Sequence, residues 1–387
     1  MKNNATTTIE SLPREIVVDI LSRIPTPSLL SVKLVCRSWR NIAEHPLFVD
    51  LHFSRKTENN PCLILHCDHS LKNQLHALFL YPHNRNTEVG LVKKIQVPVM
   101  PEFDIVGSCN GWLCLFESLY KMKLFMFNPF TNSCMEFPIS TLPTEMWTVF
   151  GFGFHPITNE YKVLKFSSIQ RTGRFRSYGS SSRSEVQILT VGNLSWRSLG
   201  KIPYYPIQPA SQVFTNGRLH WVNWPSRYKP GRELISFDLA DETFREVLRP
   251  DSVTREWGNY TLMVIRGCLS AAINKHYGSF DVWIMMDYGV KESWIKQFSI
   301  GVYLPKGLEQ DIDRSFRVSK FYKRSFTRIL CGLKNGEILM EYRSRALVCY
   351  DPRNETFKDI IIPGIPNWFE SVVHVGNLDG VDTNFSV

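Results

Sequence analysis

The chain has 387 residues, with 45 Lys and Arg against 36 Asp and Glu, a formal net charge of +9, and 43% hydrophobic residues. This length is too great for one small domain, and the composition excludes a wholly disordered chain. No apolar run reaches the roughly 18 residues of a membrane-spanning helix, and the opening MKNNATTTIE lacks the apolar core of a secretory signal.

The first fifty residues have the apolar pattern of a small helical unit. Pro13 fits the first turn of a helix, and Ile16, Ile20 and Ile24 follow at four-residue spacing. A second helical run lies within 29–42, after a break rich in proline. A unit of this size buries too little apolar surface to be stable alone. Its surplus of apolar side chains predicts docking either on the rest of the chain or in a partner's groove.

The order and spacing of these residues resemble an F-box over nearly the whole motif. The matching residues are Leu12-Pro13, Glu15, Ile20-Leu21, Ile24-Pro25, Ser28-Leu29-Leu30, Val35-Cys36, Ser38-Trp39 and Ile42. The resemblance implies a helical module that docks on the Skp adaptor of an SCF (Skp–cullin–F-box) ubiquitin ligase and, through it, meets the cullin and RING subunits. It further implies that eight residues contact the adaptor or form the core beneath those contacts: Leu12, Pro13, Ile16, Ile20, Leu29, Leu30, Val35 and Trp39.

Beyond the helical unit, the sequence changes to short strands in a degenerate repeat. Three copies are clear, at 108–137, 214–247 and 331–360, and weaker copies lie at 151–199 and 264–300. Each clear copy has an Asn-Gly pair, a strand, a second strand ending in Asn or Asp, a turn and a final short strand. Asn-Gly supplies positive φ at a tight hairpin, and the Asn or Asp side chain can hydrogen-bond the turn's backbone. A period near 50 residues is typical of a kelch-type propeller.

The predicted fold is a small all-α F-box module followed by an all-β domain, a six-bladed kelch-like β-propeller, with a β-sandwich as the alternative. Residues 370–375 are expected to pair with an early strand and close the ring. The VCRSW string and this second part resemble plant F-box proteins with an F-box-associated domain. The predicted divisions are a flexible N-terminus at 1–10, the F-box at 11–47, the propeller-like domain at 48–375 and a C-terminal tail at 376–387.

Motifs of catalytic chemistry are missing from the sequence. Gly151 and Gly153 lack the rest of a dinucleotide site and are interpreted as part of a blade turn. Cys62, His66, Cys67 and His69 are zinc-ligand types, but no second pair follows, and CLILH alternates like a half-buried strand. We therefore expect no catalytic residue, no metal and no cofactor. The nine cysteines, odd in number and irregularly spaced, indicate a reducing compartment, the cytoplasm or the nucleus.

Loops on a propeller face can form a binding surface, and aromatic residues and Arg are effective anchors. Seven residues are candidates for target binding on this basis: Tyr204, Tyr205, Trp224, Arg227, Tyr228, Trp257 and Trp368. Basic residues concentrate within 171–183 and 314–328. These stretches are either solvated loops and strand edges or a basic face for an acidic partner.

The sequence thus predicts a two-part, non-catalytic subunit of an SCF ubiquitin ligase. Its F-box would dock on the Skp adaptor, and its second domain would bind a protein target for ubiquitination. Two alternatives stay open, in both of which the helices are a structural cap: a propeller that senses a small molecule, and one that binds nucleic acid through 314–328. Neither a membrane nor a nucleic acid is the expected partner.

Overall fold

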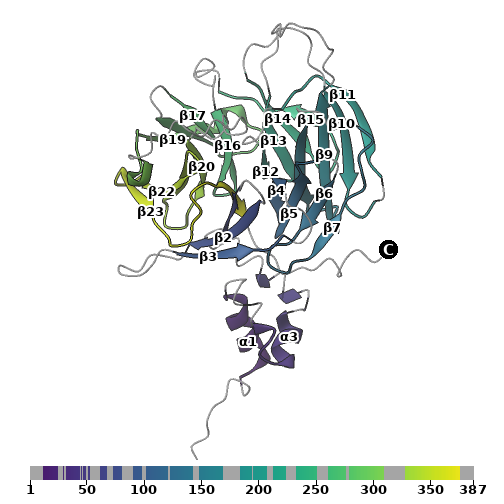
Figure 1. The fold of residues 1–387 in the computed structure, drawn as a ribbon. Helices are drawn as coiled ribbons and strands as arrows, with labels where there is room; N and C mark the ends of the chain where they lie inside the picture. Colours follow the sequence, from purple (N-terminus) through teal and green to yellow (C-terminus); the bar gives the residue numbers. More distant parts are fainter. Residues whose placement is uncertain are drawn as a thin grey trace, which may run out of the picture.

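The structure is a computed structural model of the whole chain. It describes residues 12–24, 29, 32–43, 45, 47–48, 51–52, 62–67, 73–80, 90–97, 102–120, 123–142, 148–168, 184–193, 195–206, 212–223, 232–250, 260–275, 279–308 and 327–374. A small helical module and a large all-β ring make up this part of the chain (Figure 1).

The helical module has its own hydrophobic core. Its described helices are α1 (Arg14–Ser22) and α3 (Arg37–Ala43). The core is formed by Val17, Leu21, Leu29, Val32, Ile42, Ala43 and Phe48. Within the described residues, this cluster shares no member with the hydrophobic clusters of the strands. The module therefore packs on itself, as a separate body beside the ring in Figure 1.

The strands form six four-stranded antiparallel blades, so the predicted propeller is confirmed and the β-sandwich is excluded. The first strands of neighbouring blades lie side by side around most of the ring, whereas β8 lies against β13, the second strand of the next blade. Val264 and Cys331 form a parallel bridge that joins the last two blades in chain order into one eight-stranded sheet. Two short 3-10 helices, Lys291–Ser293 and Lys306–Leu308, occur in the connections. From first strand to fourth, the blades are β24 (Glu370–His374), β1 (Cys62–Cys67), β2 (Gln74–Leu80), β3 (Gly90–Ile95); β4 (Phe103–Cys109), β5 (Trp112–Glu117), β6 (Leu124–Phe127), β7 (Cys134–Glu136); β8 (Val149–His155), β9 (Glu160–Ser168), β10 (Ser184–Thr190), β11 (Arg197–Ile202); β12 (Val213–Thr215), β13 (Arg218–Val222), β14 (Leu234–Asp238), β15 (Phe244–Glu246); β16 (Tyr260–Ile265), β17 (Cys268–Asn274), β18 (Phe280–Met285), β19 (Trp294–Ile300); β20 (Thr327–Gly332), β21 (Ile338–Tyr342), β22 (Ala346–Asp351), β23 (Thr356–Ile360).

The first blade closes the ring with a strand from the other end of the chain. Strand β24 pairs antiparallel with β1, with Ser371 opposite Leu65 and His374 opposite Cys62. This confirms the expected closing role of residues 370–375. Because β24 supplies the first strand of a blade whose other three strands begin the domain, the ring needs both ends of the β-domain to form.

The hairpins that join first to second strands depend on positive φ angles. Asn110 and Gly111 have φ of 45° and 83°, and Asn216 and Gly217 have 52° and 68°. Both residues of each pair are therefore left-handed, as a tight two-residue hairpin requires. The prediction from the Asn-Gly pairs is confirmed at these two sites, whereas in the third pair, Asn335-Gly336, only Gly336 has a positive φ, 90°.

Gly151 and Gly153 lie inside β8 rather than in a turn, so that part of the sequence interpretation was wrong. A Cβ on Gly151 would sit 2.6 Å from Cζ2 of Trp221, and one on Gly153 would sit 2.9 Å from a ring carbon of Phe214. Both rings belong to the next blade. The two glycines therefore allow the blades to approach closely.

The turn from third to fourth strand is held by a side chain at the end of the third strand. The Asn128 Oδ1 atom accepts hydrogen bonds from the backbone N–H groups of Phe130, at 3.0 Å, and Thr131, at 3.2 Å. Asp238 and Asp351 accept equivalent bonds in two other blades. The predicted use of Asn or Asp at this position is confirmed in all three copies.

We expect Asn128→Ala to lower the free energy of unfolding by about 1–3 kcal/mol, since it leaves two largely buried N–H groups without their acceptor. Asn128 has no exposed surface. Asp351→Ala is the matched control: it removes the same kind of bond at an exposed turn, where water can replace it. Urea denaturation should show the larger loss at Asn128, and equal losses would contradict the role of burial.

Candidate docking surfaces

Helix α1 exposes an apolar face. The side chains of Leu12, Ile16 and Ile20 are 38%, 48% and 48% exposed. Ile16 and Ile20 are four residues apart and therefore lie along one side of the helix, and Leu12 lies just before the first helical residue, Arg14. We call these three residues the α1 apolar face. Exposed large apolar side chains on a module that already has a filled core are typical of a protein-docking surface.

The eight residues predicted for adaptor docking divide into two groups. Leu12, Pro13, Ile16, Ile20 and Val35 are exposed and available for contact. Leu29 is completely buried and Trp39 is half-buried against the core, whereas Leu30 lies outside the described residues.

The predicted stripe Ile16, Ile20, Ile24 is not the one that forms the core. The neighbouring stripe, Val17 and Leu21, is buried, and only Ile24 of the predicted stripe packs partly against the core. Sequence reasoning also missed two exposed leucines of the module, Leu34 at 79% and Leu47 at 73% exposure. They become visible as candidates only after the core residues are known.

The propeller candidates for target binding have different environments. Tyr204 packs 6.1 Å from the Phe244 ring, and Tyr205 is half-buried, with its N–H donating to Asn223 Oδ1. Trp368 is 38% exposed, and the Arg345 guanidinium lies 4.5 Å from its ring centre. Four candidates lie outside the described residues: Trp224, Arg227, Tyr228 and Trp257.

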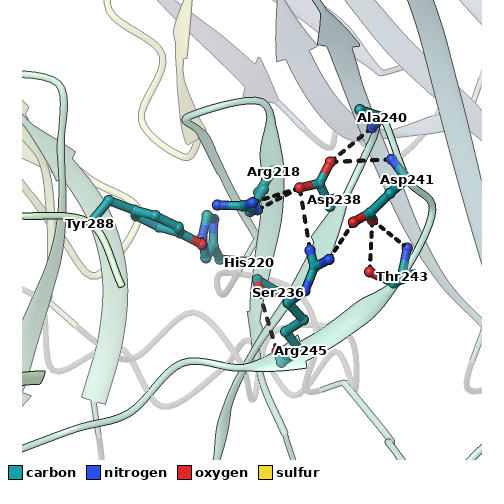
Figure 2. A network of polar contacts seen from close by, with 9 residues as sticks. All are labelled: Arg218, His220, Ser236, Asp238, Ala240, Asp241, Thr243, Arg245 and Tyr288. Atoms are coloured by element: carbon teal, nitrogen blue, oxygen red, sulfur yellow. Dashed lines mark hydrogen bonds and ion pairs between the residues drawn. The ribbon is translucent and has the colours of Figure 1, made fainter. Parts of the chain in front are cut away.

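A polar network surrounds the turn of the fourth blade (Figure 2). Arg218 donates from Nε to Asp238 Oδ2 at 2.8 Å, and Arg245 reaches the same oxygen at 3.4 Å and also pairs with Asp241. Asp241 Oδ1 accepts bonds from the backbone N–H and hydroxyl of Thr243. Burial alone would raise the pKa of Asp238, but the N–H of the turn and Arg218 bring it below its ordinary value.

The same network reaches the fifth blade through His220 and Tyr288. The Tyr288 hydroxyl donates to His220 Nε2 at 2.7 Å, and His220 Nδ1–H points to the Val213 carbonyl at 3.3 Å. Arg218 lies over the Tyr288 ring, 5.1 Å from its centre. These acidic, basic and hydroxyl groups form hydrogen bonds and ion pairs with one another. The network is therefore best explained as a structural contact that holds the fourth and fifth blades together.

The cysteines and histidines near the start of the β-domain form part of a strand. Cys62, His66 and Cys67 lie in β1, which is buried along its whole length, so the strand is confirmed but is fully rather than half-buried. His69 lies outside the described residues. Among the residues that the structure describes, no group of three or more His, Cys, Asp or Glu could hold a metal ion. All nine cysteines are described, and each is a free thiol.

One member of the predicted basic stretch 314–328 is not a surface residue. Arg328 forms a two-pronged ion pair with Glu341, and their side chains are only 19% and 2% exposed. Arg328 is therefore neither a solvated residue of a strand edge nor part of a basic face, because a carboxylate on the paired strand neutralises it. The preceding residues, 314–326, lie outside the described part of the chain.

A class of proteins is defined by a helical module followed by a six-bladed propeller. Comparison of the sequence with known families identifies this class. Residues 62–379 match the family described as "F-box associated beta propeller domain", and residues 9–54 match the "F-box-like" family. The chain belongs to the F-box proteins that carry an F-box associated β-propeller domain. The resemblance seen in the sequence is confirmed.

Relatives from Arabidopsis thaliana align over most of the chain. F-box protein At3g07870 is 46% identical over 391 residues, covering 97% of this chain and 93% of that protein. F-box/kelch-repeat protein At3g23880 is 27% identical, covering 75% and 79%, and F-box protein CPR1 is 25% identical, covering 95% and 88%. No described helix has the length and hydropathy needed to cross a membrane.

Proposed function

We propose that this protein is a substrate-recognition subunit of an SCF ubiquitin ligase. The helical module docks on the Skp adaptor, which links it to the cullin and RING subunits, and the propeller binds a protein target. The chain performs no chemistry itself but raises the effective concentration of the target near the ligase's catalytic subunits. Membership of the F-box family and the F-box names of its relatives support this role. We place its action in the cytoplasm or nucleus, in keeping with its nine free thiols.

The observation that carries the proposal is the α1 apolar face. Within the described residues, the hydrophobic core of the module is formed without Leu12, Ile16 and Ile20. These side chains are exposed and do not belong to that core. The alternative in which the helices cap the propeller would require them to share a hydrophobic cluster with the strands. The described clusters are separate instead.

We expect Ile16→Asp to weaken binding of the full-length chain to a purified Skp adaptor by at least about tenfold, because it places a charge in an apolar contact. Stability should change little, since Ile16 is half exposed. Co-purification followed by titration calorimetry measures the loss. Ile157→Asp is the matched control, because it makes the same substitution at an 88% exposed isoleucine of the propeller.

Full adaptor binding by a folded Ile16→Asp chain would remove the α1 apolar face from the interface. Absence of binding by the unmodified, folded chain would contradict the ligase role altogether. Propeller functions that need no adaptor would then have to be tested, beginning with stabilisation by small molecules.

A further inference from the structure

Each blade of the ring ends in a fourth strand that forms the outer edge of its sheet. These strands are β3, β7, β11, β15, β19 and β23. An edge strand presents a row of unpaired backbone N–H and C=O groups, to which an extended segment of another protein can add as a further strand. The edges that are open to such addition therefore indicate where a partner can bind.

Five of the six edges are unsuited to strand addition. Strands β7 and β15 are only three residues long. Strands β11 and β19 each contain a bulge, which leaves Leu199 and Gln297 without an opposite residue and interrupts the strand. Strand β23 is already contacted by the connection from the fifth blade, because the Tyr303 hydroxyl and the Lys306 N–H donate to the Asp359 carboxylate at 3.0 and 3.1 Å.

Strand β3 lacks these obstacles. Its six residues pair with β2 in one unbroken register. Within the described residues, its outer N–H and C=O groups have no backbone partner. The sixth blade touches β3 on a face rather than along this edge, since a Cβ on Gly364 would lie 3.8 Å from Cβ of Val92. Strand β3, at the rim of the ring in Figure 1, is therefore the outer strand whose described edge is both long and regular.

The side chains of β3 add two positive charges to this edge. Lys93 and Lys94 are exposed, and neither forms an ion pair or a side-chain hydrogen bond with the described part of the chain. Because they are consecutive in a strand, they project to opposite faces, whereas Leu91, which is 48% exposed, lies on the same face as Lys93. Burial and the Lys94 cation together lower the pKa of His76, which is directly opposite Lys94. An added strand would therefore meet one uncompensated cation on each face.

We infer that an extended acidic segment of the protein target adds to β3 as a fifth strand of the first blade. This inference rests on the proposed function, because it names the chemistry of the target that the ligase subunit would select. Opposite charges and apolar pairs stabilise neighbouring strands, so acidic residues belong opposite Lys93 and Lys94 and an apolar residue belongs opposite Leu91. In the antiparallel pairing that is commoner in sheets, the segment reads as two acidic residues, then any residue, then an apolar residue.

A second copy of this chain is a poorer occupant of the edge. Two β3 strands side by side would bring four lysines together, because each strand contributes Lys93 and Lys94. Like charges opposite each other destabilise a pair of strands. The lysines therefore oppose self-association through this edge, as lysines on edge strands commonly do, and still admit an acidic strand.

The first test uses the full-length chain and a fluorescein-labelled peptide of about ten residues, in which two Glu are followed by Thr and Val and flanked by β-branched residues. Fluorescence anisotropy measures binding. Lys93→Glu and Lys94→Glu should each weaken binding by about tenfold. Lys201→Glu is the matched control, because Lys201 is also an exposed lysine of an outer strand but lies in the bulged β11. It should leave peptide binding nearly unchanged.

Charge reversal on both partners should restore binding. A peptide with Lys in place of both Glu should bind the double variant Lys93→Glu with Lys94→Glu and should not bind the unmodified chain.

Methylation of the peptide backbone tests strand addition itself. In an antiparallel pair, every second residue of the added strand directs its N–H to the edge, and the residues between direct theirs away. Two further peptides carry methyl groups on the backbone nitrogens of one or the other alternate set. One of them should lose binding and the other should retain it.

Three results would overturn the inference. These are no peptide binding by the unmodified chain, equal effects of Lys93→Glu and Lys201→Glu, and equal affinities of the two methylated peptides. Adaptor binding, measured on the same samples, separates the two proposals. If the unmodified chain binds the adaptor but not the peptide, only this inference fails; if it binds the peptide but not the adaptor, only the proposed function fails.

Discussion

Glu341→Gln is expected to lower the free energy of unfolding by about 3–5 kcal/mol, among the largest effects of any single substitution in the ring. Glu341 is 1% exposed and forms a two-pronged ion pair with Arg328, with N–O distances of 3.1 and 3.0 Å. Removing one charge of a buried pair leaves the other without compensation. Burial alone would lower the pKa of Arg328, but Glu341 and Glu370 raise it, so Arg328 stays charged.

The same pair holds the strand that closes the ring. Arg328 donates to the Ser371 carbonyl at 2.7 Å, and the Ser371 N–H donates to Glu341 Oε2 at 2.7 Å. Ser371 belongs to β24, whereas Arg328 and Glu341 belong to the last blade before it. The ion pair therefore joins the sixth blade to the first, at the junction where the ring must close.

Matched variants distinguish two contributions to the loss of stability: the uncompensated buried charge and the lost hydrogen bonds to Ser371. Glu136→Gln breaks an exposed ion pair with Lys123 and should cost at most about 1 kcal/mol. The double variant Arg328→Met with Glu341→Met removes both charges and should recover part of the loss, short of the bonds to Ser371. Chemical denaturation monitored by Trp fluorescence measures all three. A loss at Glu341 no greater than at Glu136 would contradict the closing role of the pair.

Much of the propeller could be predicted because its turns are specified locally and repeatedly. An Asn-Gly pair or a strand-ending Asn fixes its own hairpin through positive φ or a side-chain bond, as Asn110-Gly111 and Asn128 do. Several such signals at a similar spacing define blades even where single copies are weak. The closing strand followed from the expectation that a strand late in the sequence pairs with an early one, so that the ring has no open sheet edge.

The division of α1 into core and docking surface could not be predicted. Ile16 and Ile20 have the same four-residue spacing as Val17 and Leu21, so periodicity alone fits either pair facing the core. The choice depends on the position of α3 and of Phe48, which pack against Val17 and Leu21. The sequence of the helix alone does not specify these tertiary contacts.

The buried partner of Arg328 was missed for a related reason. Arg328 and Glu341 are directly opposite each other in the β20–β21 hairpin, but a bulge between Ile329 and Cys331 shifts the register of that hairpin. Counting outward from the turn without the bulge gives the wrong partner. Arg328 therefore looked like the last member of a basic stretch.

Lowering the pH from 7.5 to 5 is expected to destabilise the folded protein by about 2 kcal/mol through His220 alone. Burial, aided by the nearby Arg218 cation, lowers the pKa of His220 to about 4. In the unfolded chain this pKa is about 6.5. Between these two values the unfolded chain binds a proton that the folded chain does not. The contribution to stability is therefore complete above about pH 6.5 and is lost progressively as the pH falls toward 4.

The hydrogen bonds around the ring give the physical reason for this loss. The His220 Nε2 atom accepts the Tyr288 hydroxyl at 2.7 Å, and protonation would remove that acceptor. The new charge would have no exposed surface and would lie near Arg218. His220→Gln keeps one donor and one acceptor but does not titrate, so its stability should fall less over the same interval.

The measurement is the difference between two pH dependences. Urea unfolding at pH 7.5 and pH 5, for the unmodified chain and for His220→Gln, cancels the contributions of the other histidines. The network carboxylates Asp238 and Asp241 have pKa values below their ordinary ones, so the stabilisation that they provide is lost only at pH values below about 4. A slope that His220→Gln leaves unchanged would show that His220 binds a proton as readily in the folded chain as in the unfolded chain. The fourth and fifth blades would then have to be joined by a different arrangement of these groups.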